Sequence, residues 1–169
     1  MLPEEEGDDA VDLSNTARML RARPRGDACR DNLPPAMPHR RLHRLVFLAA
    51  GLYNIAWGIF SALDPQWFFR WSGMAPLNHP SIFACLAMVI GLYGVIYLEV
   101  ARVPERGWLL AAVGFAGKIL GPLGLAALIW RGEWPLASIV LCVTNDFIWW
   151  LPFGLYLADA WPSFRRDWV

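Results

Sequence analysis

Four long apolar runs, separated by short polar connections, dominate the chain after residue 44. They cover 45–63, 81–98, 107–130 and 136–158. A helix needs about 20 mostly apolar residues to cross a bilayer, so all four runs are long enough. Backbone N–H and C=O groups find no water to hydrogen-bond inside a membrane, whereas in a helix they bond to each other. The pattern therefore predicts an all-α protein: a transmembrane bundle of four helices with a membrane domain over 42–158.

The polar connections differ in their arginine content, which indicates an orientation. Arginines cluster before the first run, and the second connection also carries two, whereas the first and third connections carry one each. Because basic residues favour the cytoplasmic side, we expect both termini in the cytoplasm and the protein in a bacterial inner membrane. Tryptophans near the run ends fit the aromatic belts of a membrane protein.

The loops also carry structural signals. Asp64 and Pro65 begin a segment rich in tryptophan and phenylalanine that stops at Gly73, which predicts a short helix lying in the membrane interface. The connections 99–106 and 131–135 are tight, so the helices that they join should be antiparallel neighbours. Each run also carries small residues at helical spacing, which allow membrane helices to approach closely. These faces are Gly51, Asn54, Gly58 and Ser61, then Ala84, Ala87, Gly91 and Gly94, then Gly114, Gly117, Gly121 and Gly124.

The two ends of the chain read differently from the membrane domain. Residues 1–41 begin with acidic residues, continue with arginines and prolines, and contain too little apolar sequence to fold alone. They predict a disordered cytoplasmic tail. An alternative of equal weight is that translation of the natural protein begins at Met37, so that residues 1–36 reflect a wrongly chosen start codon. Residues 159–169 are expected to be a short cytoplasmic C-terminal tail.

Composition narrows the functional classes. Hydrophobic residues make up 56% and charged residues 18% of the chain, against about 25% charged in soluble proteins. This excludes an ordinary soluble enzyme, a nucleic-acid-binding domain and a disulfide scaffold. His39 and His43 are interpreted as interfacial basic residues rather than metal ligands, and Cys85 and Cys142 as small packing residues rather than a disulfide. No metal site, cofactor or complete catalytic set is expected.

Only two formally charged residues lie inside the four runs, Lys118 and Asp146. Counting along each helix places both about 15–16 Å from a membrane surface, and therefore in one plane near the middle of the bilayer. A lone charge there costs at least ~2.5–3.5 kcal/mol. We therefore expect a Lys118–Asp146 ion pair, with Asn54 and Asn145 as hydrogen-bonding partners.

Further residues complete this predicted midplane polar cluster. Trp149 shares a helical face with Asp146 and offers an apolar wall, and Tyr93 lies near the same depth. Pro122 should free the main-chain carbonyl of Lys118, and Pro152 that of Ile148, because proline lacks the N–H that would bond to it. Polar side chains and broken backbone gather in this way at intramembrane binding sites. The favoured interpretation is nevertheless structural, a buried ion pair that only fixes how the helices meet, and a binding site is the alternative.

Several segments together carry a resemblance to a family. GKILGPLG at 117–124, NDFIWWLPF at 145–153, LYNIAWG at 52–58 and GLYG at 91–94 resemble a family of small, uncharacterised bacterial integral membrane proteins with four spans. The resemblance covers about 42–158. It implies the fold and the membrane location, and it implies no activity.

Three functions are therefore considered. The first is a non-enzymatic structural or accessory subunit whose partner is another membrane protein or a second copy of the chain. The second is a small transporter, or a protein that binds a ligand or a proton, in which Lys118 holds the bound species and Asp146 supplies the counter-charge. The third and weakest is a membrane enzyme that acts on a lipid-like substrate with Asp146 as base.

Overall fold

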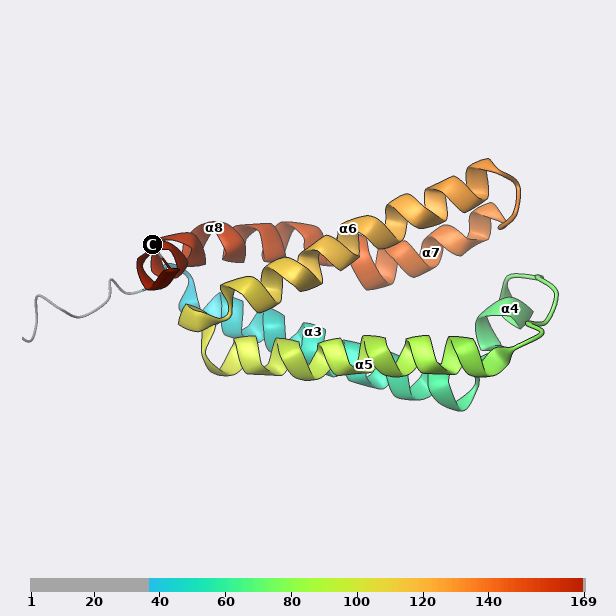
Figure 1. Cartoon of the computed structure of the whole chain (residues 1–169), viewed down its shortest axis with the longest axis horizontal. Coiled ribbons are helices and arrows are strands. Elements are labelled where there is room, and N and C mark those ends of the chain that lie inside the picture. Colours follow the sequence, from blue (N-terminus) through green and yellow to red (C-terminus); the bar gives the residue numbers. More distant parts are fainter. Residues whose placement is uncertain (1–36, 169) are drawn as a thin grey trace, which may run out of the picture. The chain divides into compact units, whose positions relative to one another are not determined.

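The computed structural model describes residues 37–168 and is all-helical over that range. Four long antiparallel helical segments run between two ends (Figure 1). They are α3 (Arg40–Leu63), α5 (Pro80–Arg102), α6 (Trp108–Trp130) and a last segment that begins at Leu136. This last segment consists of η2 (Leu136–Ser138), α7 (Ile139–Cys142), the π-helical turn η3 (Val143–Phe147) and α8 (Ile148–Trp168). We call the end where α3 begins and α8 ends the terminal end, and the other end the loop end.

All four segments are long and apolar enough to cross a membrane, as the hydropathy pattern predicts. The helices extend further than the apolar runs. α3 begins at Arg40, inside the segment predicted as a tail, and α8 continues to Trp168 through the region predicted as a C-terminal tail. Residues 1–36 of the predicted N-terminal tail lie outside the described residues.

The first two spans are in backbone contact through the predicted small residues. A Cβ atom at Gly58 would lie 2.7 Å from the Cα atom of Gly91, and one at Gly94 would lie 2.6 Å from the carbonyl oxygen of Gly51. No side chain fits at these two points, so glycine is required there. Small residues therefore set the spacing of the α3–α5 pair, as they do in other membrane helix pairs.

The glycine face of the third span is only partly used in packing. A Cβ atom at Gly114 would meet the hydroxyl of Tyr97, and one at Gly121 would lie 3.6 Å from a carboxylate oxygen of Asp146. Gly117 and Gly124, in contrast, have no neighbouring atom within 4 Å of such a position. The prediction that all four glycines form one packing seam is therefore wrong for these two residues.

At the loop end, the predicted short helix is present as α4 (Trp67–Trp71), and Gly73 follows it with a φ of +71°. Phe68 is buried and its ring stacks on Trp134 with 5.9 Å between centroids, which joins the α4 loop to the 131–135 loop. The Gln66 side chain accepts a hydrogen bond from the amide of Leu77 and donates one to its carbonyl oxygen. These contacts fix the longest connection of the described chain.

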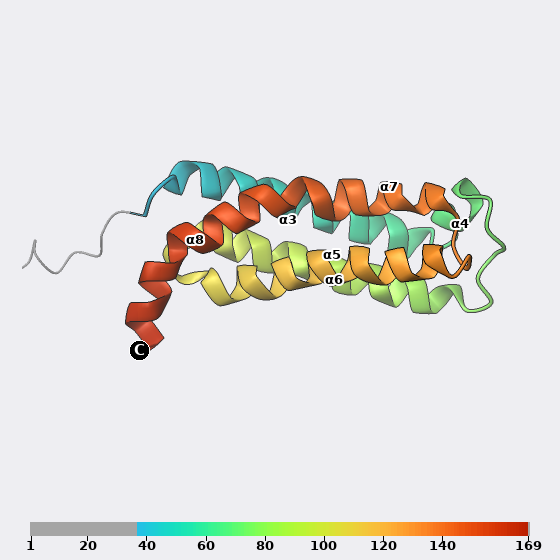
Figure 2. The same cartoon turned by 90° about the horizontal axis from the view of Figure 1, so that it is seen from above.

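The largest buried side chains gather toward the terminal end. The ring of Phe47 on α3 lies 4.5 Å from that of Phe153 and 4.6 Å from that of Tyr156, both on α8. Tyr97 on α5 lies edge-on to Phe153 at 5.1 Å. Large apolar side chains such as Leu63 and Leu151 are exposed on the outside, where a bilayer would cover them. Figure 2 shows the same four segments from above.

Candidate functional site

The two intramembrane charges come from neighbouring elements of the second helical hairpin. Lys118 lies in the middle of α6, and Asp146 lies in the π-helical turn η3 of the last segment. Both side chains are buried, with exposures of 4% and 8%. Their shared depth and inward orientation agree with the depth obtained by counting residues.

The expected Lys118–Asp146 ion pair is absent: no nitrogen–oxygen contact within 4.0 Å joins these two side chains. The Lys118 ammonium instead donates a hydrogen bond of 2.5 Å to the main-chain carbonyl oxygen of Asn145. That oxygen lies within the π-helical turn, where the regular ladder of α-helical hydrogen bonds is interrupted. The lysine charge is therefore partnered by backbone next to the aspartate rather than by the carboxylate itself.

Three aromatic rings surround the lysine ammonium. Its nitrogen lies 5.7 Å from the ring centroid of Tyr97, 6.0 Å from that of Trp149 and 5.9 Å from that of Phe153. A cation within about 6 Å of a ring face is attracted by the ring's quadrupole, by ~2 kcal/mol or more when the pair is desolvated. Trp149 is thus a wall of the site, as expected, while Tyr97 and Phe153 are contacts that helical periodicity did not single out.

The backbone of α6 is also open at the site. Pro122 has no N–H to donate to the carbonyl of Lys118, and the indole nitrogen of Trp150 donates to that oxygen instead, at 3.0 Å. The predicted free acceptor is therefore present, and a side chain from the last segment occupies it. Lys118 is bonded to the last segment through both its ammonium and its carbonyl.

The Asp146 carboxylate has a different environment from the lysine. One of its oxygens faces Gly121 on α6, and Cys142, one turn earlier in the last segment, is also buried. Pro122 and Cys142 also line an apolar groove of about 270 Å³ between α6 and α7, whose walls include Leu125 and Ile139. Asp146 does not line this groove, but the next residue, Phe147, does.

The other predicted members of the cluster are placed unequally. Asn145 supplies its main-chain oxygen, while its side-chain oxygen is buried without a hydrogen-bond partner, as is the indole nitrogen of Trp149. Asn54 is buried on α3, but its side-chain oxygen is also unpartnered and it does not bond to the lysine or the aspartate. The expected role of Asn54 as a partner of the pair is therefore wrong. The ring of Tyr93 lies next to that of Tyr97, with 6.4 Å between the two centroids.

A second polar cluster lies at the terminal end and was not anticipated. Asp159 on α8 accepts hydrogen bonds from His39 and His43, at 2.9 and 2.8 Å. The i, i+4 spacing of the histidines was visible in the sequence. The aspartate was not linked to them, because it follows them by more than a hundred residues and had been placed in a tail. The two described cysteines, Cys85 and Cys142, are free thiols.

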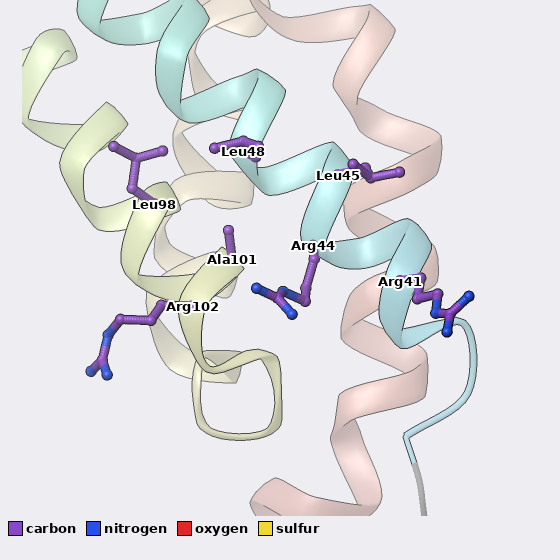
Figure 3. Close-up of a pocket in the computed structure, with 7 residues that line it drawn as sticks. All are labelled: Arg41, Arg44, Leu45, Leu48, Leu98, Ala101 and Arg102. Atoms are coloured by element: carbon purple, nitrogen blue, oxygen red, sulfur yellow. The ribbon is translucent and has the colours of Figure 1, made fainter.

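A further groove of the described chain lies outside both clusters. It measures about 520 Å³ and is formed by α3 and α5 at the terminal end (Figure 3). Arg44 extends across it and Arg102 lies at its edge, while Leu48, Leu98 and Ala101 form its apolar side. Arg102 is held in a two-bond ion pair by Glu99. This groove does not reach Lys118 or Asp146.

Comparison with known proteins returns no similarity: no family model, no curated protein and no solved structure matches this chain. The family resemblance of its motifs therefore stays a prediction, and the functional argument rests on the geometry of the site.

Proposed function

We propose that this chain is a small multi-pass membrane protein that binds a proton at the Lys118–Asp146 site, and that this binding serves the transport of a proton or a small polar species. The observation that carries the proposal is that two charges are buried at one depth without contacting each other. Ionisable residues within spans are expensive and mark ion pathways and proton relays in membrane proteins. A pair kept only to register two helices is expected in direct contact, because that contact offsets the cost of burying the charges.

The surroundings of the two charges support the same proposal. The side-chain oxygen of Asn145 and the indole nitrogen of Trp149 are buried, polar and unpartnered. Each such group costs ~1–3 kcal/mol unless something bonds to it. A water molecule or a small polar ligand beside Asp146 and Lys118 would satisfy both groups. The apolar groove between α6 and α7 is lined by Cys142 and Phe147, which lie close to Asp146 along the last segment.

Infrared difference spectroscopy tests the proposal without a known substrate. The protein in lipid vesicles is compared between near-neutral and alkaline buffer, where exposed carboxyls stay ionised, and we expect a protonated-carboxyl band near neutral pH that disappears in Asp146→Asn. Asp159→Asn is the matched control and should keep the band. Lys118→Met should move the pH at which the band appears, because it removes a neighbouring positive charge. If the band is absent from the wild type, or persists in Asp146→Asn, the proposal is wrong.

A second candidate, the accessory subunit, is favoured by a different observation. Gly117 and Gly124 on α6 face no atom within 4 Å, and Leu120 beside them is exposed. A strip of small residues of this kind permits close approach of another membrane helix. The subunit proposal predicts an assembly in mild detergent whose mass falls when both glycines are replaced by leucine. A wild-type protein that is monomeric under the same conditions contradicts it.

A further inference from the structure

We propose that His39, His43 and Asp159 form a binding site for a divalent transition-metal ion, with zinc as the ion that suits it best. The histidines lie at the start of α3 and the aspartate lies on α8. One ligand atom from each of the three side chains lies within 4.8 Å of the other two. This site is at the terminal end, on other residues than Lys118 and Asp146, and it does not depend on the proposed proton binding.

The distances are those of a site that needs little movement to accept an ion. His39 Nδ1 lies 2.9 Å and His43 Nε2 lies 2.8 Å from the same oxygen, Asp159 Oδ2. Zinc binds imidazole nitrogen and carboxylate oxygen at about 2.0–2.2 Å, so two ligand atoms around a tetrahedral ion lie about 3.3 Å apart. An opening of a few tenths of an ångström between each histidine and the aspartate would therefore admit the metal.

The local backbone holds the two histidines on one side of the helix. His39 is the N-cap residue of α3, and the amide of His43 donates a hydrogen bond of 3.0 Å to its carbonyl oxygen. His39 has a φ of +50° and is the one described non-glycine residue with a positive φ. That conformation is unfavourable for a residue other than glycine. The imidazole of His39 is thereby joined to Asp159, and an ion that binds the same atoms would offset the cost.

The site is supported on its inner side and open on its outer side. The His43 side chain is 1% exposed, and its ring lies edge-on to Tyr156 at 5.3 Å between centroids. Tyr156 is itself fixed by a hydrogen bond of 2.7 Å to the carbonyl oxygen of Pro104. The His39 side chain is 58% exposed. Three protein ligands with one open side are the arrangement in which zinc retains a water or takes up another ligand.

The donor set identifies the class of ion. Two imidazoles and one carboxylate suit zinc, cobalt, nickel and ferrous iron, whereas calcium and magnesium prefer an all-oxygen set. Charge favours the same class, because the aspartate neutralises half of the charge of a divalent cation. Among these metals zinc accepts three or four ligands without a preference imposed by d-electrons.

Calorimetric titration of Zn²⁺ into the purified full chain tests the inference. The protein carries a tag without histidine and the substitution Cys29→Ser, so that neither the tag nor that thiol competes. We expect one equivalent of zinc to bind, and the affinity to fall at least tenfold in His39→Gln and in Asp159→Asn. Loss of an outer-shell partner alone typically costs 10–100-fold. His79→Gln is the matched control, since His79 is exposed and far from the cluster in sequence, and it should bind like the parent.

The choice of variants keeps the result decisive. His43 is buried and its replacement could impair folding, whereas His39 is exposed and its replacement leaves the core intact. A Co²⁺ derivative should show a visible absorption band of a low-coordinate ion in the parent and lose it in His39→Gln. Absence of stoichiometric binding in the parent would overturn the inference and leave a hydrogen-bonded triad. If His39→Gln and Asp159→Asn bind zinc as tightly as the parent does, the inference is overturned as well.

Discussion

The indole nitrogen of Trp150 donates a 3.0 Å hydrogen bond to the main-chain oxygen of Lys118, on the helix that faces it. The acceptor is free because Pro122, four residues later, has no N–H. Trp150→Phe should therefore lower the free energy of unfolding by ~1–3 kcal/mol, the cost of a buried acceptor without a partner. Denaturant titration in detergent micelles measures the change.

A coupled variant checks that Pro122 is the reason. Pro122→Ala supplies an N–H that bonds to the Lys118 carbonyl within α6. Trp150→Phe should then cost clearly less in the Pro122→Ala background than in the wild type. Equal costs in the two backgrounds would contradict the account of this hydrogen bond.

The second prediction concerns the contact between α3 and α5. A Cβ atom at Gly58 would lie 2.7 Å from both the Ala87 carbonyl oxygen and the Gly91 Cα atom, and backbone cannot move away as a side chain can. Gly58→Ala should lower the unfolding free energy by ~1–3 kcal/mol, as overpacking does. Gly124→Ala is the matched control: with open space around it, it should be neutral or stabilise by ~0.5–1 kcal/mol. The thermal midpoints of the two variants in detergent decide the question.

The third prediction concerns the hydrogen bond from the Tyr156 hydroxyl to the Pro104 carbonyl oxygen, 2.7 Å long and buried. It joins α8 to the connection between α5 and α6. Tyr156→Phe keeps the ring and leaves the carbonyl unpartnered, so it should cost ~1–3 kcal/mol. Tyr53→Phe, on a half-buried ring of α3, should cost much less. The same denaturant titration compares them, and equal losses would argue against this contact.

The fourth prediction is a pH dependence at Glu105, between α5 and α6. Burial acts to raise the pKa of this carboxyl, but the hydrogen bond from Arg40 and the charges of Arg40 and Arg44 outweigh it and hold the pKa below its usual range. The ion pair therefore stabilises the fold above the ordinary pKa of glutamate, and this contribution is lost as pH falls through the lower pKa of the folded state. Glu105→Gln should flatten the acid side of the plot of thermal midpoint against pH. Arg40→Gln should do the same, and combining the two should add nothing further.

Much of the fold could be predicted from hydropathy because a membrane imposes both the length and the internal hydrogen bonding of each span. The ends of the helices were harder to predict, because the helices that contain Arg40 and Trp168 continue beyond the apolar runs. The third span shows the limit of counting small residues. Its buried side is made of Ala111, Gly114, Lys118, Pro122 and Leu125, so Gly114 alone of the four predicted glycines is buried.

The depth of the candidate site could be predicted because the rise per residue of a helix is fixed. Its contacts could not. The expected ion pair assumed that Lys118 would extend toward Asp146, whereas a main-chain oxygen of the π-helical turn accepts its hydrogen bond. No residue type marks a π-helical turn in a sequence. Neither the main-chain acceptor at Asn145 nor the change in which face of the span is buried could therefore be predicted. Asp159 directly follows the apolar run 136–158, so it fell in the predicted C-terminal tail.

The π-helical turn η3 is equivalent to one extra residue inserted into the last span. Up to and within it the buried positions are Ser138, Cys142 and Asp146, and after it they are Phe153, Tyr156 and Ala160. Loss of a single codon at the exposed Thr144 would convert the turn to α-helix and rotate the part of the span before the turn by about 100° relative to the part after it. The reading frame of the gene would survive and so would the hydropathy of the span. Asp146 would nevertheless leave its position beside Gly121. A one-codon deletion at this point would therefore disrupt the site, although the hydropathy pattern of the sequence would give no sign of it.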